Sequence, residues 1–292
     1  MTTPTHLPQL PFEPAPRRSF RSLTLVPLFP RDEPSLDYVG LTHALADGLL
    51  VTEVDAGGEV QTLLVDNPLA TLVLLYEGEE LVGAKQNRIL DRTLLVDARS
   101  RLPVPVSCVE RGRWSYRTHA FADAKRAAYP ELRRLKHEGG GQSLTWTSVA
   151  AKASRLNASS PTEAAEEMYV SRAPVLDEYA EALPLAEGQS GVIVALGGVP
   201  FCLDYVSRPD VFARLYPKLL AGYALDAIER PDESIPGGVD EFLRGVERAT
   251  REPQPPVGVG EARRFASPSV VGSELAVGGG ELVAVAAFSR TA

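Results

Sequence analysis

Cysteine is scarce in this chain: Cys108 and Cys202 are the only two among its 292 residues. Two thiols so far apart in the sequence exclude a disulfide framework and favour a cytoplasmic protein. The four histidines are scattered, and the sequence contains neither a His-Glu-x-x-His motif nor a paired Cys-x-x-Cys. Because transition metals in proteins are commonly held by such spacings, we predict no metal site, and the cofactor stays unknown.

Long apolar runs and nucleotide-binding signatures are also lacking. No uncharged apolar stretch approaches about eighteen residues, so we expect no membrane span. The phosphate-binding P-loop, the dinucleotide-binding glycine fingerprint and the Gly-x-Ser-x-Gly nucleophile elbow are all missing. A net charge of -8 argues against general affinity for nucleic acid or anionic membranes. The sequence therefore predicts no nucleic-acid partner and no membrane, and leaves protein partners unknown.

The composition is that of a globular protein, with 44% apolar and 23% charged residues. Strand-like patterns come first, helical patterns occupy the middle, and strand patterns return near the end. This order favours an α+β fold, with a β-rich body of mostly antiparallel strands and a helical middle segment. We expect residues 1–21 to be a flexible, proline-rich lead-in. Residues 22–292 then form a single domain with a helical insertion over about 123–183.

Several local patterns make more specific structural predictions. Residues 51–65 alternate on both sides of a glycine-containing turn and predict a β-hairpin. Pro103 and Pro105 restrict their strand to a sheet edge or a bulge, because proline has no backbone donor. The run Ser160–Glu163 has the form of a helix-capping box. The helix that it starts meets Pro174, which we expect to kink or split it.

Two dense polar clusters stand where an apolar, β-rich core is expected. The first polar cluster is Glu77–Arg88 and the second is Pro105–Trp114, with ordinary strand residues between them. Clusters so spaced can meet at neighbouring strand ends and form a site. From Glu77 to Arg117 there are eight Lys or Arg and six Asp or Glu, a local balance of +2 in an acidic chain. We therefore expect a small anionic ligand rather than a polymer.

The first polar cluster carries groups for anion binding and for acid–base chemistry. Lys85 and Arg88 are candidate anion ligands, and Gln86 and Asn87 supply amide donors and acceptors. The carboxylates of Glu77, Glu79 and Glu80 are candidate general bases or Mg²⁺ ligands. Strand alternation, however, places Glu80 on the opposite face from the other two. The alternative is a solvated turn with surface ion pairs. The candidate catalytic residues, if the protein is an enzyme, are Glu79 and Glu80.

The second polar cluster contains a cysteine among basic residues. Cys108 is a candidate nucleophile, since a reactive thiolate needs positive surroundings, but a free cysteine is commonly an inert core residue. Trp114 is interpreted as a core residue, although it also suits stacking on a base. The candidate ligand-binding residues of this cluster are Ser107, Glu110, Arg111 and Arg113.

The two clusters resemble the hallmark segments of a bacterial domain family. That family is named for its association with ADP-ribosylglycohydrolases and rhodanese-phosphatase proteins. The segments SSPTEA, GVIVALGGVPFCLDYVSRPDVFARLYPKLLAGYALDA and VVGSEL to VAAF are similar to the rest of its domain, so the resemblance extends from about Leu23 to Phe288. It implies a neighbourhood in ADP-ribose and phosphate metabolism rather than a particular reaction. The family's polar motif falls on Glu79, Glu80, Lys85, Gln86, Asn87, Arg88, Ser107, Cys108, Glu110, Arg111, Arg113 and Trp114.

Three functions fit these observations. The leading hypothesis is a binding or sensor module for an ADP-ribose-like or other phosphorylated ligand, without covalent catalysis. The second is a hydrolase of such a ligand, with Glu79 or Glu80 as the general base. The third is a non-catalytic structural or partner protein, whose hallmark residues form a buried ion-pair network. The sequence does not decide whether the protein is an enzyme.

Overall fold

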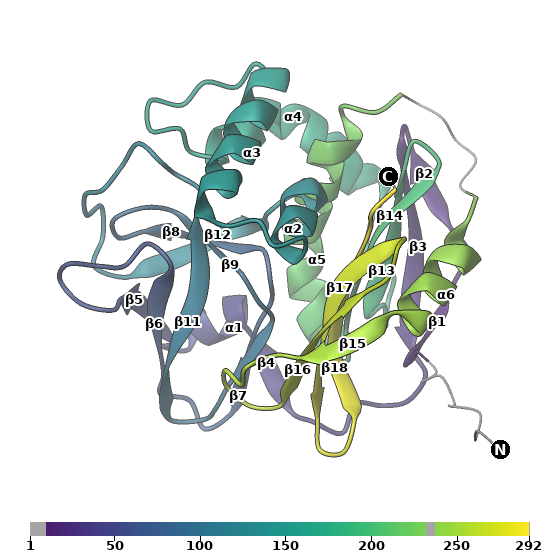
Figure 1. Cartoon of the computed structure of the whole chain (residues 1–292), viewed down its shortest axis with the longest axis horizontal. Helices are drawn as coiled ribbons and strands as arrows, with labels where there is room; N and C mark the ends of the chain where they lie inside the picture. Colours follow the sequence, from purple (N-terminus) through teal and green to yellow (C-terminus); the bar gives the residue numbers. More distant parts are fainter. Residues whose placement is uncertain (1–9, 232–236, 292) are drawn as a thin grey trace.

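The computed structural model describes residues 10–231 and 237–291. Two β-structures lie side by side, with helices above and between them (Figure 1). Nearly all strand pairs are antiparallel, and strands outnumber helices among these residues. The predicted α+β fold with a β-rich body is confirmed. No helix within these two ranges is long and apolar enough to cross a membrane.

A nine-stranded antiparallel sheet combines strands from both ends of the chain. Its order is β1-β3-β13-β14-β18-β17-β16-β15, and β2 also pairs with β3. The apolar run of β13 is explained by burial on both faces, since alternate residues enter two different hydrophobic clusters. The strands are β1 (Phe12–Pro14), β2 (Arg18–Phe20), β3 (Leu23–Pro30), β13 (Gly191–Leu196), β14 (Val199–Val206), β15 (Thr250–Pro253), β16 (Glu261–Ala266), β17 (Val270–Val277) and β18 (Glu281–Ser289).

The second β-structure is built from a continuous part of the chain. A six-stranded sheet has the order β12-β8-β9-β11-β6-β5, and a small sheet has the order β10-β7-β4. Strand β6 is buried at every second residue, which is the pattern of a strand with one face on the core. The strands are β4 (Tyr38–Gly40), β5 (Leu50–Glu53), β6 (Thr62–Asn67), β7 (Leu72–Leu75), β8 (Glu79–Gly83), β9 (Arg88–Leu90), β10 (Leu94–Val96), β11 (Ser100–Cys108) and β12 (Phe121–Ala127).

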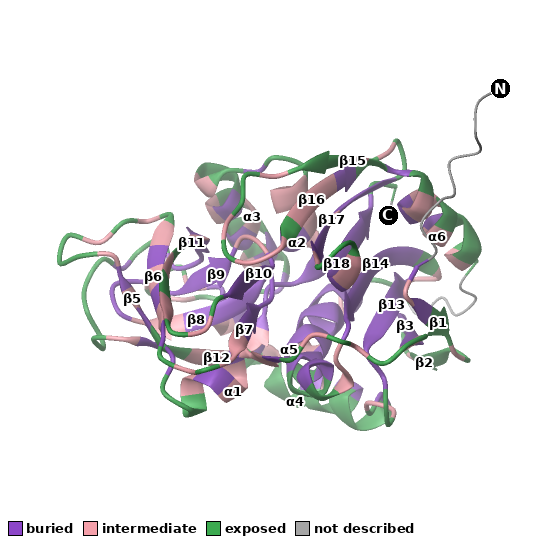
Figure 2. Cartoon of the chain, turned by 90° about the horizontal axis from the view of Figure 1, so that it is seen from below, coloured by how far each residue is buried: buried purple, intermediate pink, exposed green. Residues whose placement is uncertain are grey.

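Helix α5 lies between the two β-structures and is buried along most of its length (Figures 1 and 2). It packs against β12 on one side and β13 on the other, whereas α4 and α6 expose much of their surface. A large apolar cluster fills the space between the β-structures. The helices are α1 (Leu41–Ala46), α2 (Pro130–His137), α3 (Gln142–Arg155), α4 (Glu166–Ala182), α5 (Pro209–Ala227) and α6 (Val239–Arg248).

The hairpin predicted over residues 51–65 is confirmed by the antiparallel pairing of β5 with β6. The two prolines of β11 lie in the part of the strand that pairs with β6, and pairing with β9 begins only at Val106. That half of β11 is therefore a local edge, as proline requires.

Other local predictions need correction. The lead-in is shorter than residues 1–21, because β1 and β2 already belong to the large sheet; residues 1–9 lie outside the described ranges. Residues 123–127, expected in the helical insertion, are the end of β12. Ser160 accepts backbone N–H bonds within a turn, and α4 begins only at Glu166. Pro174 does not split α4, because tertiary packing holds the helix together on either side.

A buried ion-pair network, which we call the Arg133 network, connects the two β-structures. Arg133 of α2 is 2% exposed, and its Nη2 donates to Asp204 of β14 at 2.6 Å and to Glu77, before β8, at 3.2 Å. The hydroxyls of Tyr76 and Tyr223 donate to the two Asp204 oxygens at 2.7 and 2.5 Å. The two carboxylates come from different β-structures, so one guanidinium links both halves.

The Arg133 side chain also dictates the backbone beside it. A Cβ at Gly78 would lie 2.7 Å from Arg133 Cδ, and Gly78 has a φ of +84°. Both the left-handed backbone and the close approach require glycine here.

We predict that Arg133→Met destabilises the fold strongly. Removing the guanidinium leaves two buried carboxylates without their shared partner, which typically costs about 3–5 kcal/mol. Urea denaturation measures the free energy of unfolding. The matched control is Arg101→Met, because Arg101 is exposed and pairs with Asp66 at the surface, where a pair contributes less than about 1 kcal/mol. Equal losses in the two variants would contradict the role given to the network.

Candidate functional site

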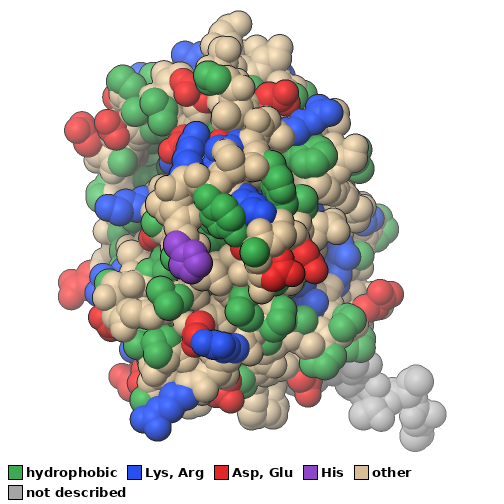
Figure 3. Space-filling model, turned by 90° about the vertical axis from the view of Figure 1, so that its left-hand side faces the viewer, with side chains coloured by type: hydrophobic (Ala, Val, Ile, Leu, Met, Phe, Trp, Pro, Cys, Tyr) green, Lys and Arg blue, Asp and Glu red, His purple; other side chains and the backbone are tan. Residues whose placement is uncertain are grey.

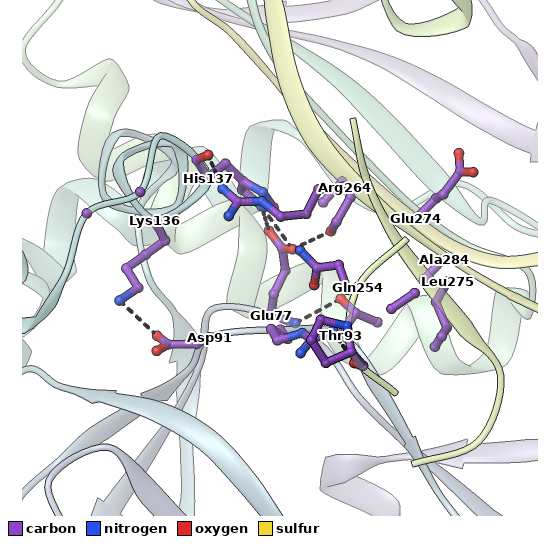
Figure 4. Close-up of a pocket in the computed structure, with 17 residues that line it drawn as sticks. Glu77, Asp91, Thr93, Lys136, His137, Gln254, Arg264, Glu274, Leu275 and Ala284 are labelled. Carbon is purple, nitrogen blue, oxygen red and sulfur yellow. Dashed lines mark hydrogen bonds and ion pairs between the residues drawn. The ribbon is translucent and has the colours of Figure 1, made fainter. Parts of the chain in front are cut away.

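A cavity of about 350 Å³ lies where the two β-structures face each other (Figure 4). Three parts of the chain form its walls. The first is the β7–β8 and β9–β10 connections, the second is the carboxyl end of α2, and the third is the face of β16, β17 and β18 with the residues that follow β15. We call this space the inter-sheet cavity. Its size is within the range of about 300–1,000 Å³ that small-molecule sites occupy.

Glu77 is a fixed negative charge in the cavity wall. His137 Nε2 lies 2.9 and 3.0 Å from its two carboxylate oxygens, and the Ser273 hydroxyl donates to it at 2.9 Å (Figure 4). Burial alone raises the pKa of Glu77, but His137, Arg133 and Ser273 outweigh that effect and hold its pKa at about 2. A carboxylate so acidic and so fully bonded is a poor proton acceptor near neutral pH.

A second polar group on the cavity wall contains one of the predicted residues. Lys136 Nζ donates to the Ser107 hydroxyl at 2.7 Å and lies 3.4 Å from Asp91. The Ser107 hydroxyl in turn donates to Asp91 at 3.0 Å. Burial raises the pKa of Asp91 more than Lys136 and Ser107 lower it. Of the sequence-predicted site residues, Ser107 is the one that bonds cavity-lining side chains.

Two arginines bring uncompensated positive charge to the cavity. Among the described residues, neither Arg92 nor Arg264 has a carboxylate partner: Arg92 Nη2 donates to the Pro255 carbonyl at 3.2 Å, and Arg264 Nη2 to the His137 carbonyl. The Arg92 Nε is buried with no hydrogen-bond partner. Burial and then the charge of Arg264 lower the pKa of Arg92. Two arginines that repel each other across a cavity leave a place for an anion.

The two polar clusters do meet, as their spacing predicts, but the contacts between them do not involve the residues that line the inter-sheet cavity. Strand β9 pairs with β11 so that Arg88 is opposite Cys108. Arg113 donates to both Glu110 oxygens at 2.9 and 2.7 Å, and the Asn87 N–H donates to Glu110 at 3.0 Å. This Glu110–Arg113 network is buried, and its charges neutralise one another.

The remaining basic and amide residues of the clusters have varied partners. Lys85 Nζ donates to the carbonyls of Ala56 and Gly57 at 2.8 and 2.5 Å. Gln86 accepts a bond from Arg88 Nη1 at 2.9 Å. Arg111 is exposed at the surface, 4.0 Å from Glu163.

The two candidate catalytic carboxylates lie away from the inter-sheet cavity. Glu79 is bound by Lys218 at 2.7 Å and Glu80 by Arg126 at 2.8 Å, and both are buried. They point to opposite faces of β8, as strand alternation requires. Burial raises the pKa of Glu80 despite its ion pair with Arg126.

Cys108 is a buried residue whose sulfur accepts the Glu110 N–H at 3.3 Å. Burial raises the pKa of the thiol, and the nearby Arg88 lowers it less. The thiolate that a nucleophile needs is therefore disfavoured, so the interpretation of Cys108 as a core residue is the one its surroundings support.

Sequence reasoning did not single out four cavity residues: Arg92, Lys136, His137 and Arg264. The basic residues at the C-terminal end of α2 did not indicate a site, because cations are favoured at the C-terminus of any helix. Arg92 lies two residues after the end of β9 and within the positively charged stretch, which was a usable signal. Arg264 belongs to β16 and had no distinguishing motif, because only the packing of the two β-structures brings it to the cavity.

A family model supports the resemblance seen in the sequence. The model described as the ARG and Rhodanese-Phosphatase-superfamily-associated Protein domain matches residues 13–288, which is nearly the whole chain. No curated protein and no solved structure matches.

We predict that Glu77 makes the fold sensitive to acid. Its pKa in the folded protein, about 2, is below its ordinary value of 4.5, so its contribution to stability is complete above pH 4.5 and is lost as the pH falls through 2. The difference corresponds to about 3 kcal/mol. Urea denaturation of the wild type and of Glu77→Gln at pH 6, 4 and 2.5 measures this contribution. The variant should lose distinctly less stability over that range, and identical losses would refute the assignment.

Proposed function

This chain belongs to the family of ARG and Rhodanese-Phosphatase-superfamily-associated Protein domains, and from that premise we propose that it binds an ADP-ribose-like or other phosphorylated small molecule in the inter-sheet cavity. The association in the family's name supports a ligand of this chemistry without specifying one. The cavity, rather than the two polar clusters themselves, offers the open volume that a ligand needs.

The pair Arg92 and Arg264 is the observation that carries this proposal. Arginines withdrawn from solvent are ordinarily paired, and these two half-buried arginines have no carboxylate partner among the described residues. A phosphate offers several oxygens to the planar donor edge of a guanidinium, and a charge-assisted bond of this kind is roughly twice as strong as a neutral one. A phosphate between them would also relieve their mutual repulsion, so both arginines favour the same ligand.

The acidic residues of the cavity do not oppose this ligand. Glu77 is bound by His137 and Arg133, and Asp91 lies beside Lys136. The Glu274 carboxylate is directed away from Glu77 and is bound by Arg251 and Arg263 (Figure 4). The charge left over in the cavity is therefore positive. The side-chain amide of Gln254 and the polar wall around Ser273 suit hydroxyl groups of a sugar.

Binding without catalysis is the form of the proposal that the geometry favours. Glu79 and Glu80, the candidate general bases, are held in ion pairs outside the cavity. Glu77, which does line the cavity, has a pKa of about 2 and accepts bonds from several donors. A general base needs a pKa near the working pH, and the Glu77 carboxylate is too acidic for that role.

The hallmark residues themselves fit a structural role. Glu110, Arg113 and Asn87 bond mainly to one another, and Lys85 caps two backbone carbonyls. This observation favours the third hypothesis, a buried ion-pair network, for these particular residues. A structural role for the clusters and ligand binding in the cavity are compatible, because the two involve different side chains.

We predict that ADP-ribose or a simpler phosphorylated compound raises the melting temperature of the wild-type protein. A ligand at one hundred times its dissociation constant adds about 2.7 kcal/mol of stability. Differential scanning fluorimetry with ADP-ribose, mononucleotides, sugar phosphates and inorganic phosphate detects the shift. Arg264→Ala and Arg92→Ala should each abolish it.

The matched control is Arg31→Ala, which removes an arginine paired with Glu13 far from the cavity residues. It should retain the full shift. A shift that survives in both cavity variants would move the ligand to another site. Turnover of the bound compound, followed by chromatography, would overturn the non-catalytic form of the proposal.

A further inference from the structure

Beneath Trp114 of the second polar cluster lies another polar site, which we call the Arg88 chamber and which is built around Arg88 of the first polar cluster. Arg88 is fully buried, and its Nη1 donates to Gln86 at 2.9 Å. Within residues 10–231 and 237–291, its Nε and Nη2 have no hydrogen-bond partner. These two nitrogens form the side edge of the guanidinium, where two N–H groups point in the same direction. A buried arginine with that edge unused calls for a partner.

Glu53 stands next to the unused edge of Arg88. Its Oε1 lies 4.0 Å from Arg88 Nη2 and accepts the Lys85 N–H at 3.3 Å. Its Oε2 is buried and has no hydrogen-bond partner in the part of the chain that the structure describes. Three unsatisfied polar atoms therefore sit on two neighbouring, buried side chains. Leaving such groups unpaired costs about 1–3 kcal/mol each, and more when they are charged. A ligand at this place would meet two donors, Arg88 Nε and Nη2, and beside them one acceptor, Glu53 Oε2.

An aromatic ring lies against the Arg88 guanidinium. The Arg88 Cζ lies 5.6 Å from the centre of the Trp114 ring, and Lys85 Nζ lies 5.0 Å from it. Trp114 is 46% exposed, and the residues that follow it up to His119 are exposed as well. Figure 3 shows the face on the left-hand side of Figure 1, where hydrophobic and basic side chains lie next to each other near the centre. A half-exposed ring on an exposed connection can move aside and then stack on a ligand.

We propose that the Arg88 chamber recognises the edge of a guanine-type base, stacked against Trp114. Guanine presents two adjacent acceptors, O6 and N7, which match the side edge of an arginine, and beside them an N1–H donor for a carboxylate. Adenine has an amino donor in the position of O6, so it would oppose Arg88. A bare oxyanion has no donor for Glu53 and would be repelled by it. The proposal goes beyond the phosphate-binding function, and it concerns a different site.

Nucleosides separate the two sites because they carry no phosphate. In a Trp146→Phe background, Trp114 is the only tryptophan, so its fluorescence reports directly on the chamber. Titration with guanosine should change this fluorescence and saturate. Adenosine should bind at least tenfold more weakly, and inorganic phosphate should leave the fluorescence unchanged.

Variants of the three chamber residues test the recognition edge by calorimetry with guanosine. Arg88→Lys removes the paired N–H donors of the guanidinium but keeps the positive charge. Glu53→Gln removes the negative charge but keeps an acceptor oxygen. Each substitution should weaken guanosine binding at least fivefold. Trp114→Leu should weaken it at least tenfold, because base stacking on an aromatic ring is lost. Arg101→Ala is the matched control, since Arg101 is an exposed arginine of the same sheet, and it should bind as the wild type does.

The outcomes distinguish the proposal from its rivals. Equal affinities for guanosine and adenosine would show stacking without edge recognition and would overturn it. A fluorescence response to phosphate alone would make the chamber an anion site. No response to any probe would mean that water satisfies these polar groups. Either result would overturn the proposal of guanine recognition. If Arg88→Lys does not fold, Trp114→Leu still decides the question, because the half-exposed Trp114 can be replaced without opening the core.

Discussion

The Arg133 network is the interaction on which the remaining structure depends. One buried guanidinium binds a carboxylate from each β-structure, and the geometry of those two bonds sets how the halves face each other. Glu77 is held by the same arginine and by His137, so the position of this wall of the inter-sheet cavity depends on the network. Buried ion pairs contribute little net stability, but removing one partner is costly, which makes them effective at specifying one arrangement.

Much of the fold was predictable because local patterns carry it. The hairpin β5–β6, the doubly buried β13 and the helix α2 each follow from alternation, apolar runs or a proline at the helix start. The capping-box pattern at Ser160 failed because its hydroxyl stabilises a turn instead. Pro174 did not break α4, and Pro217 likewise lies inside the unbroken α5, since packing against neighbouring elements outweighs the loss of one backbone bond.

The candidate site was only partly predictable, for a physical reason. Adjacent strands bring the two polar clusters together, and that proximity follows from short-range spacing. The inter-sheet cavity instead combines Arg92 with Arg264, which are distant in sequence and meet only when the two β-structures pack. Polar residues inside a strand were a correct signal of an unusual core. They did not reveal that most of these charges would pair among themselves.

The topology of the nine-stranded sheet has a consequence for how the chain matures during synthesis. The six-stranded sheet uses only residues between β5 and β12, so it can close soon after that stretch leaves the ribosome. Strand β3 is made earlier, but its partner β13 comes about 160 residues later, and β14 must wait for β18 at the very end. At translation rates of about 5–20 residues per second, β3 presents an apolar, unpaired edge for roughly ten to thirty seconds. Until β13 pairs with it, this edge can associate with other chains, so the long loop between the two strands makes folding during synthesis prone to aggregation.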